Sequence, residues 1–370
     1  MGKEFLEINI SVLVISVLIL ADLGGLLLIV SPHRLFNEEE GQRIASVSKV
    51  IQLTGENSPS HTDQYMVYGT DLGSMFKHEQ KMYFVFGDTF GTRHEDQFGA
   101  GGEMWRSNTM AYTCDKNASD GIIFDGMILN STGVAKQIIS SSHCDEITKI
   151  PTAGISVNGN IYLYFMSVHQ WGDHGHWDAN YCGVAKSTDN GNSFTILEDL
   201  TWPGDSNFIQ TAIAPVGDYL YFWSIPSGRF GGVQLMRVPS EKIESQDAYE
   251  YLSGFQGQQE IWSPNYSNGL TIVKSPVGEL SVIWNEYIGR WIMTYLNERT
   301  YSIELRKAIN PWGPWSKPFK LVSAIDYPGL YGAYMHPVYT EENGRIFYFT
   351  MTQWGPYNVF LMRAELQEKE

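Results

Sequence analysis

From about residue 45 onward, short runs of aromatic and β-branched residues alternate with turns rich in Gly, Pro, Asn and Asp. This alternation is typical of β-strands joined by tight turns. One sequence unit, a turn followed by an aromatic strand, recurs along the chain. Its five copies are His78–Asp88, Asn158–Ser167, Val216–Ser224, Val277–Asn285 and Asn343–Met351. The turn glycines of the last four copies are 58, 61 and 66 residues apart, a period typical of four-stranded propeller blades. We therefore predict an all-β fold, a five-bladed β-propeller.

Five blades of this length fill residues 45–367, which we expect to form one propeller domain of the catalytic type. The strand candidate Ala45–Gly55 precedes the first copy of the unit. We expect this strand to pair with the last blade and close the ring, because closure protects the edge strands. The innermost strand of each blade should directly precede the repeated unit. These expected innermost strands are Tyr68–Phe76, Pro151–Val157, Phe208–Val216, Gly269–Val277 and Tyr334–Thr340.

Residues Ser187–Phe194 match the pattern S-x-D-x-G-x-x-aromatic, the Asp box of hairpins in sialidase-type propellers. In this pattern the Asp and the Gly form the turn and the aromatic residue packs beneath it. The alternative is an ordinary hairpin turn. Both interpretations support a β architecture, and neither makes Asp189 catalytic.

The first 35 residues form a separate segment. Residues 8–30 are an almost continuous hydrophobic run of 23 residues, long enough for a helix to cross a bilayer core. We predict a transmembrane or signal-anchor helix within residues 1–35, and a cleaved signal peptide is the alternative. The protein would then be membrane-anchored with its propeller outside the cytoplasm, or secreted. The flanking charges do not fix the orientation.

The balance of charges narrows the choice of partners. Asp and Glu outnumber Lys and Arg by 41 to 25, and the net charge of −16 argues against nucleic acid and anionic lipid. Aromatic residues make up 14 % of the chain, which suits a surface that handles carbohydrate. The three Cys lack metal-type spacing, and the sequence has no G-x-S-x-G, Walker A, H-E-x-x-H or G-x-G-x-x-G motif. The enzyme classes that depend on these motifs are thereby excluded.

Two carboxylates stand out as candidates for catalysis. Asp71 lies in Gly-Thr-Asp-Leu-Gly and Asp88 follows Phe-Val-Phe-Gly, so apolar residues and glycine flank both. Polar residues at the entrances of the innermost strands should converge at one mouth of the channel. Glycoside hydrolysis needs two carboxyl groups, and burial shifts their pKa values. We predict Asp71 and Asp88 as the catalytic pair; the alternative is that each caps a turn or accepts backbone hydrogen bonds.

Eight further residues at strand ends and in neighbouring loops are predicted to bind substrate. They are Arg106, Asn108, His169, Trp171, Gln210, Asn285, His336 and Trp354. We expect the loop that carries Trp171 and Trp177 to stack on a sugar ring rather than to bind a metal. No cofactor and no metal ligand set are predicted, although His336 near the axis is compatible with a structural calcium or sodium ion. Glu286 is expected to be an exposed turn residue.

Six motifs occur in the same order as in a known family. They are Gly69–Gly73 (GTDLG), Phe86–Gly91 (FGDTFG), Trp105–Asn108 (WRSN), Trp284–Trp291 (WNEYIGRW), Tyr331–Pro337 (YGAYMHP) and Gln353–Val359 (QWGPYNV). Over residues 45–366 the chain resembles a family of five-bladed β-propellers that was long catalogued as a domain of unknown function. The family is frequent in actinobacteria, and some members are classed as endo-D-arabinanases. The resemblance implies a propeller akin to those of arabinanases and sucrases, and it places Asp71 and Asp88 in the family's acidic motifs.

Three features depart from the family pattern: Glu286, the hydrophobic N-terminal segment and the His-rich loop of residues 169–178. We expect a glycoside hydrolase of a furanoside polysaccharide, and the resemblance implies endo action on a D-arabinan-like glycan. Three alternatives remain: a non-catalytic, lectin-like surface propeller, a protein-binding propeller with a flat mouth, and a hydrolase for sialic acid or fructose. The expected partners are a polysaccharide or oligosaccharide and, through the N-terminal segment, a membrane.

Overall fold

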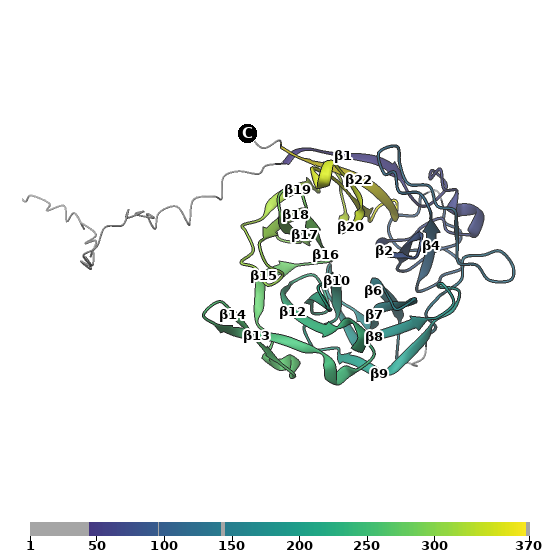
Figure 1. Cartoon of the computed structure of the whole chain (residues 1–370). Coiled ribbons are helices and arrows are strands. Elements are labelled where there is room, and N and C mark those ends of the chain that lie inside the picture. Colours follow the sequence, from purple (N-terminus) through teal and green to yellow (C-terminus); the bar gives the residue numbers. More distant parts are fainter. Residues whose placement is uncertain (1–43, 95, 142–144, 368–370) are drawn as a thin grey trace, which may run out of the picture. The chain divides into compact units, whose positions relative to one another are not determined.

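The computed structural model describes residues 44–94, 96–141 and 145–367. In this part of the chain, 22 strands form five antiparallel sheets that stand like blades around a central axis (Figure 1). The other regular elements are 3-10 turns: η2 (Thr62–Tyr65), η3 (Ser240–Lys242), η4 (Gln246–Ala248), η5 (Tyr266–Asn268) and η6 (Glu342–Gly344). The predicted all-β, five-bladed propeller is therefore confirmed.

Three blades have four strands in simple chain order. Blade 1 contains β2 (Leu72–His78), β3 (Lys81–Phe86), β4 (Thr109–Thr113) and β5 (Gly126–Met127). Blade 2 contains β6 (Thr148–Val157), β7 (Asn160–Trp171), β8 (Trp177–Ser187) and β9 (Thr195–Pro203). Blade 4 contains β16 (Leu280–Asn285), β17 (Arg290–Asn297), β18 (Ser302–Ala308) and β19 (Phe319–Ser323). The first strand of each blade lies nearest the axis (Figure 1).

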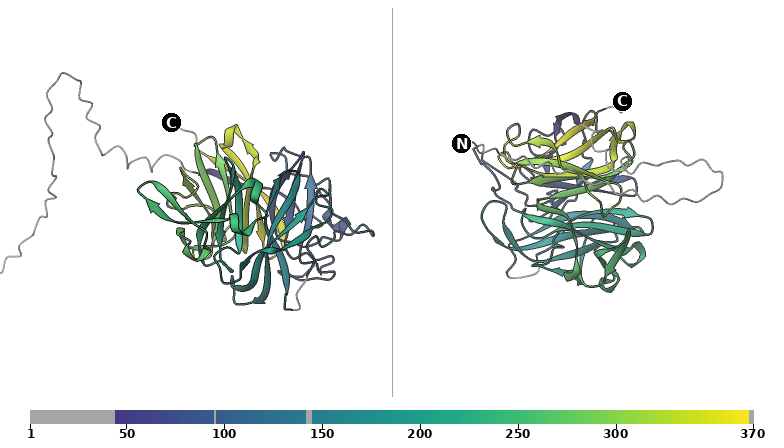
Figure 2. Two further views of the ribbon diagram at one scale, coloured as in Figure 1. Left: turned by 60° about the horizontal axis from the view of Figure 1, so that its bottom comes forward. Right: turned by 90° about the vertical axis from the view of Figure 1, so that its left-hand side faces the viewer.

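Blade 3 carries an insertion. Its first three strands are β10 (Gln210–Val216), β11 (Tyr219–Ile225) and β12 (Gly231–Pro239). One half of β12 pairs with β13 (Glu250–Gln256), which forms a hairpin with β14 (Gln259–Ser263), and the other half pairs with β15 (Thr271–Val277). The hairpin of β13 and β14 extends beyond the edge of the ring (Figures 1 and 2).

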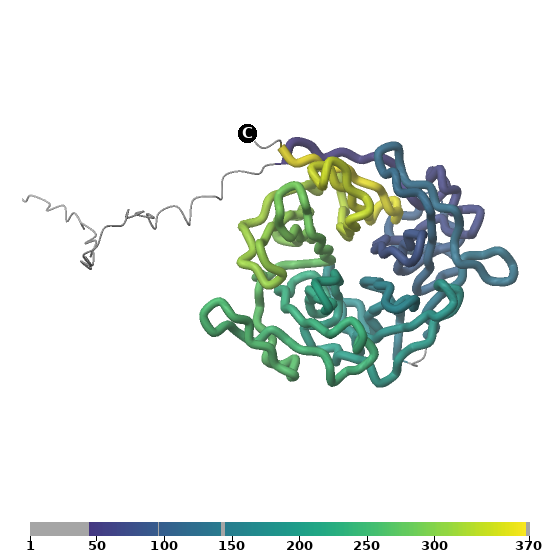
Figure 3. Tube along the Cα trace, viewed as in Figure 1, coloured from purple at the N-terminus to yellow at the C-terminus, as the bar shows by residue number. Residues whose placement is uncertain are grey.

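Blade 5 joins the two ends of the propeller. It contains β20 (Leu330–Glu341), β21 (Ile346–Gln353), β22 (Asn358–Leu366) and, as its outer strand, β1 (Ile44–Gln52). β1 runs antiparallel to β22, with Val47 opposite Ala364. Figure 3 follows the chain once around the ring until the yellow β22 meets the purple β1. The predicted closure of the ring by a strand near residue 45 is confirmed.

The middle strands of the blades are buried along almost their whole length. In β11 and β21 nearly every residue is buried, on both faces of the sheet. This follows from the architecture, since each blade is covered on both faces by its neighbours and its middle strands become continuous apolar runs. The repeated aromatic unit of the sequence is this middle strand in blades 1, 2, 3 and 5.

Blade 4 begins one strand later than predicted. We predicted Gly269–Val277 as its innermost strand, but this segment is β15 and pairs with β12 as an outer strand of blade 3. The innermost strand of blade 4 is β16, and Gly278 lies between the two blades. The physical reason is the inserted hairpin of β13 and β14, which takes up the length that an outer strand normally occupies.

The Asp box forms the turn between β8 and β9. Oγ of Ser187 donates to Asp189 Oδ1 at 2.7 Å, and the backbone N–H groups of Gly191 and Ser193 donate to Ser187 Oγ and Asp189 Oδ1. Asp189 thus fixes its own turn through local hydrogen bonds.

The predicted helix within residues 1–35 lies outside the described residues. Among the residues that the structure does describe, no helix has the length and apolar character needed to span a membrane.

Candidate active site

The innermost strands all begin at the same mouth of the channel, where the structure is hollow. A cavity of about 560 Å³ lies there. Residues at or near the starts of the innermost strands line it: Asp71, Ile150, Thr152, Gln210, Glu279, Leu330 and Tyr331. Asp88, Asp173 and Glu298 also line this space, which we call the acidic cavity. The propeller thus brings side chains from all five blades to one place.

A strained turn positions Asp71. The next residue, Leu72, has φ of 68°, a left-handed conformation that is uncommon for a residue other than Gly, and a register shift follows between Leu72 and Ser74. Thr352 of the neighbouring blade 5 accepts a hydrogen bond from Leu72 N at 2.9 Å. Strain of this kind is typical of functional sites, where it aims a side chain.

Gly87 makes room for the carboxyl group of Asp71. A Cβ atom at this position would lie 2.5 Å from Oδ1 of Asp71, closer than any real contact. Its backbone N–H also donates to the carbonyl oxygen of Asp71 at 3.3 Å. Because Asp88 directly follows Gly87, the carboxyl group of Asp71 packs against the backbone next to Asp88.

Burial and charge make Asp71 a weak acid. Tyr331 Oη donates to Asp71 Oδ2 at 3.0 Å, and Oδ1 has no hydrogen-bond partner in the described part of the chain. Burial, with the nearby charge of Asp88, raises the pKa of Asp71 to about 7, although the hydroxyls of Tyr331 and Tyr357 act in the opposite direction. Asp71 therefore holds a proton well above the pH at which an ordinary Asp loses it.

Asp88 has a more polar environment. Thr148 Oγ1 and Trp105 Nε1 donate to its Oδ1 at 2.7 and 2.9 Å. Burial raises the pKa of Asp88, and both donors oppose that shift because they stabilise the ionised form. Two neighbouring carboxyl groups in different environments are the arrangement that divides acid and base roles.

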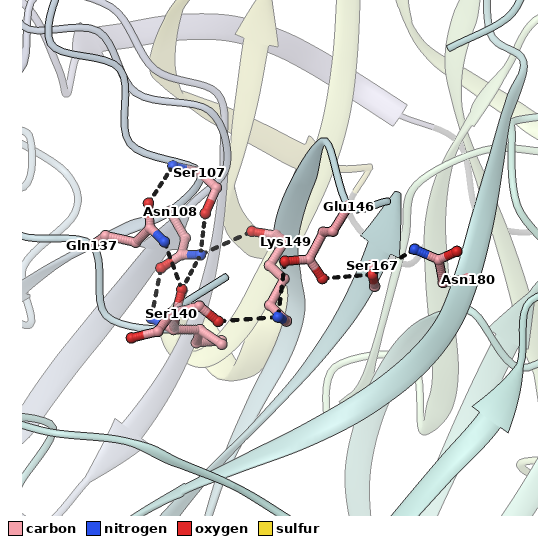
Figure 4. A network of polar contacts seen from close by, with 9 residues as sticks. Ser107, Asn108, Gln137, Ser140, Glu146, Lys149, Ser167 and Asn180 are labelled. Atoms are coloured by element: carbon pink, nitrogen blue, oxygen red, sulfur yellow. Dashed lines mark hydrogen bonds and ion pairs between the residues drawn. The ribbon is translucent and has the colours of Figure 1, made fainter. Parts of the chain in front are cut away.

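A buried polar network includes the residue that follows Thr148 in the chain (Figure 4). This residue, Lys149, forms an ion pair with Glu146 at 2.9 Å, and both side chains are fully buried. Glu146 also accepts from Ser167 Oγ at 2.6 Å, and Asn108 Nδ2 donates to the carbonyl oxygen of Lys149 at 2.9 Å. The network fastens the start of β6, and with it the Thr148 hydroxyl that contacts Asp88.

A second cluster of charges also lines the cavity. Arg229 Nε and Nη2 both contact Oε1 of Glu279, at 2.9 and 2.8 Å. Its Nη1 contacts Glu298 Oε1 at 3.2 Å, and its guanidinium lies 4.7 Å from the ring centroid of Tyr331. This cluster was not predicted from the sequence, because we predicted Gly269–Val277 as the innermost strand of blade 4, which places Glu279 in the turn after that strand. With the correct phase, Glu279 stands at the entrance of an innermost strand, as Asp71 does.

Exposed aromatic side chains surround the mouth. Trp171, Tyr301 and Trp354 line the cavity and are 46 %, 62 % and 44 % exposed. They belong to blades 2, 4 and 5, and Tyr301 has φ of 46°. Large exposed aromatic rings are costly to leave in water and are well suited to stack on sugar faces.

The structure brings five of the ten predicted site residues to the acidic cavity. They are Asp71, Asp88, Trp171, Gln210 and Trp354. Gln210 is held by its own bonds to the carbonyl oxygens of Pro226 and Gly228. The loop that carries Trp171 and Trp177 borders the cavity as expected, and Glu286 is an exposed turn residue.

The other five residues lie elsewhere, which corrects the prediction that they converge with the acids. Asn108 is buried in the network described above, and Arg106 is buried and donates to Met66 O at 2.6 Å. His169 is exposed outside the cavity lining. Asn285 is at the far end of β16, where it donates to Gly344 O at 2.7 Å, because the phase of blade 4 is shifted.

His336 belongs to a second cavity, of about 380 Å³, lined by the later residues of the same innermost strands. Burial lowers the pKa of His336 to about 4, so its ring is neutral at physiological pH. In the described residues no group of three or more His, Cys, Asp or Glu side chains is placed to hold a metal ion.

Comparison with known families identifies the chain. The family model described as "Domain of unknown function (DUF4185)" matches residues 57–363. The chain belongs to this family. Comparison with curated proteins gives no match.

Solved structures support the fold of this DUF4185 protein. A putative hydrolase from Bacteroides ovatus is similar with a TM-score of 0.58 and 11 % identity, over 86 % of this chain and 90 % of that chain. An exo-β-1,3-galactanase from Phanerochaete chrysosporium, a variant bound to β-1,3-galactotriose, gives a TM-score of 0.50 and 10 % identity, over 87 % of this chain and 64 % of that chain. At these identities the likeness concerns the fold.

Proposed function

We propose that this DUF4185 protein is a glycoside hydrolase that uses Asp71 and Asp88 as its carboxyl pair. The observation that carries the proposal is that both acids line one cavity at the channel mouth, in different environments. A protein-binding propeller has no need of a hollow mouth with two buried acids. The names of the two similar structures, a hydrolase and a galactanase, agree with the proposal.

The geometry suggests a division of roles. Asp71, whose pKa is raised to about 7, is protonated at mildly acidic pH and donates its proton to the glycosidic oxygen as general acid. Asp88 receives hydrogen bonds from Thr148 and Trp105 and acts ionised, as the base for water or as the nucleophile. Activity should therefore decline as the pH rises through about 7, because Asp71 loses its proton.

The substrate we propose is a neutral furanoside polysaccharide, with D-arabinan as the first candidate and internal cleavage as the expected mode. The resemblance of the six sequence motifs to endo-D-arabinanases supports this choice. Trp171, Tyr301 and Trp354 would stack on successive sugar rings. We further propose that the propeller acts outside the cytoplasm, where such a polysaccharide is found, anchored through its N-terminal segment or secreted.

A product assay tests the proposal. The full chain is incubated with D-arabinan, L-arabinan and a panel of neutral glycans, and new reducing ends are measured by chromatography. Asp71→Asn and Asp88→Asn should each lower the rate by at least about 100-fold, a typical cost of removing a general acid or base. Asp218→Asn is the matched control, since Asp218 is exposed in the turn between β10 and β11. Release of oligosaccharides from D-arabinan by the unaltered chain supports the proposal, and no product from any glycan contradicts it.

A lectin-like propeller is the second candidate, favoured by the exposed aromatic residues at the mouth. It predicts glycan binding without turnover. Binding that persists in both Asp variants, with no product from the unaltered chain, would favour this alternative.

A further inference from the structure

The acidic cavity also contains a carboxylate oxygen that lacks a hydrogen-bond donor. Glu279 is only 5 % exposed and lines the cavity. Its Oε1 takes both contacts from Arg229, and its Oε2 has no hydrogen-bond partner in the described part of the chain. Buried carboxylate oxygens normally accept hydrogen bonds, and leaving one without a donor is costly.

The position of Glu279 is fixed by its surroundings. Arg229 is held from both sides, since its Nη1 contacts Glu298 at 3.2 Å and its backbone N–H donates to Gly175 O at 2.9 Å. Glu298 in turn lies 3.4 Å from His174 Nε2. The oxygen of Glu279 is therefore presented to the cavity by a rigid framework, which is the condition for a specific contact with a ligand.

The charges around Glu279 determine which ligand groups its Oε2 can bind. Arg229 Nε, Nη1 and Nη2 all contact carboxylates, so this guanidinium is not presented to an anionic ligand. Asp173, Glu279 and Glu298 add negative charge to the same cavity. Carboxylate groups of a uronic or sialic acid would be repelled here, whereas a sugar hydroxyl is a neutral donor that suits a carboxylate acceptor.

We propose that Glu279 is a substrate-binding residue whose Oε2 accepts a hydrogen bond from a sugar hydroxyl, and that the acidic side chains lining the cavity restrict it to uncharged glycans. Arg229 is the positioning residue that directs Oε2 into the cavity. The inference rests on the proposed function, because it concerns the glycan that Asp71 and Asp88 would cleave.

The test uses the full chain and D-arabino-oligosaccharides prepared from D-arabinan. Glu279→Gln should raise KM by about 10- to 100-fold, the effect of losing a hydrogen bond to a charged group, and should change kcat much less. Glu304→Gln is the matched control. Glu304 is an equally buried Glu of blade 4, outside the cavity lining, and its carboxylate is bonded to Tyr295 and Asn297. The control should leave KM unchanged.

A second measurement starts from a chain in which Glu279 is intact, so its first result does not depend on how the Glu279→Gln variant folds. Binding of monodeoxy oligosaccharides to Asp71→Asn is measured by calorimetry, where hydrolysis does not interfere. One deoxy position should weaken binding by about 10- to 100-fold, and adding Glu279→Gln should abolish that difference.

Several outcomes would overturn the proposal. One is that every monodeoxy ligand binds as well as its parent; another is that the unaltered chain prefers carboxylated glycans. A collapse of kcat in Glu279→Gln with unchanged affinity would make Glu279 a proton donor instead. Glycan binding with no effect at Glu279 contradicts this inference alone, whereas no binding of any glycan by the unaltered chain contradicts the proposed function as well.

Discussion

Asp71 links the stability of the protein to pH. Its pKa is raised from 3.8 to about 7 in the folded chain, so between these pH values the folded state binds more protons than the unfolded state. The free energy of unfolding must then fall as pH rises from about 4 to about 7. At higher pH the ionised, poorly solvated carboxylate costs the fold up to about 4 kcal/mol, and less where water in the cavity solvates it.

Replacing Asp71 by a neutral residue should remove the loss of stability that its ionised carboxylate causes at high pH. Asp71→Asn is expected to raise Tm at pH 8 and to leave it unchanged at pH 4, because an amide carries no charge to desolvate. Thermal unfolding of the variant and the unaltered chain across this pH range measures the difference. Equal Tm values at pH 8 would show that Asp71 is well solvated, and would remove the basis for its role as an acid at neutral pH.

Gly87 offers a test of how precisely the carboxyl group of Asp71 must be placed. A Cβ here would lie 2.5 Å from Asp71 Oδ1, so Gly87→Ala must displace that carboxyl group. We expect kcat to fall by about 100-fold, as for other small displacements of reacting groups, while circular dichroism stays native. Gly254→Ala in β13 is the control, since an added Cβ there meets nothing within 4 Å. Full activity of Gly87→Ala would argue against Asp71 as a reacting group.

A site residue could be predicted where its own sequence neighbours mark it, and not where its role depends on residues far away along the chain. Asp71 and Asp88 have sequence neighbours, glycine and apolar residues, that mark them locally. The residues that tune them, Tyr331 and Thr148, lie 260 and 60 positions away along the chain. Contacts between residues so far apart arise from the closed ring of blades and leave no pattern in the local sequence. Tyr331 lies in the family motif Tyr331–Pro337, but the motif alone does not indicate its contact with Asp71.

At the level of elements, buried hydrogen bonds of Asn108 hold the start of β6 in place beside the site. Asn108 bonds to the carbonyl oxygens of Ile139 and Lys149 and accepts from the N–H groups of Ile138 and Ile139. The sequence suggested a sugar-binding Asn, because a polar residue beside Trp105 and Arg106 is a plausible ligand. Asn108 is instead fully buried, and its amide is used by backbone groups and by Ser107 Oγ, which leaves nothing free to contact a sugar.

Asn108→Ala should therefore act on stability and rate rather than on binding. Removal of these bonds leaves buried backbone groups unpaired, at a cost of about 2–4 kcal/mol. As the start of β6 loosens, Thr148 withdraws from Asp88 and kcat falls, while KM for oligosaccharides stays the same. Urea unfolding and steady-state kinetics measure the two effects, with the exposed Asn192→Ala as control. A large rise in KM with unchanged stability would restore Asn108 as a sugar ligand.

The repeated aromatic unit does not form the same strand in every blade, which limits what its spacing can predict. In blades 1, 2, 3 and 5 the aromatic unit marks a middle strand, because only a strand covered on both faces is apolar throughout. In blade 4 the same type of unit is the innermost strand, β16, because the hairpin of β13 and β14 lengthens the preceding blade. Sequence spacing alone does not distinguish the two cases, and this ambiguity concealed Glu279.

At the level of the whole molecule, the ring is held by the pairing of its two ends. β1 covers the edge of β22 from Ile44 opposite Leu366 to Gln52 opposite Phe360. Without β1, β22 would expose a row of unpaired backbone groups, and such edges promote aggregation. The cavity depends on this closure, because blade 5 provides Tyr331 and Tyr357 and stands beside the blade that carries Asp71.

A pair of truncations tests this argument. Deletion of residues 1–53 removes β1, and we expect Tm to fall by about 5–10 °C and oligomers to form, as seen by thermal scanning and size-exclusion chromatography. Deletion of residues 1–43 retains β1 and serves as the matched control. The shorter chain should also lose activity more steeply on warming, because loosening of blade 5 removes the hydroxyl of Tyr331 from Asp71. If both truncated chains were equally stable and monomeric, packing between neighbouring blades would be sufficient to hold the ring, and the strand pairing at its ends would be dispensable.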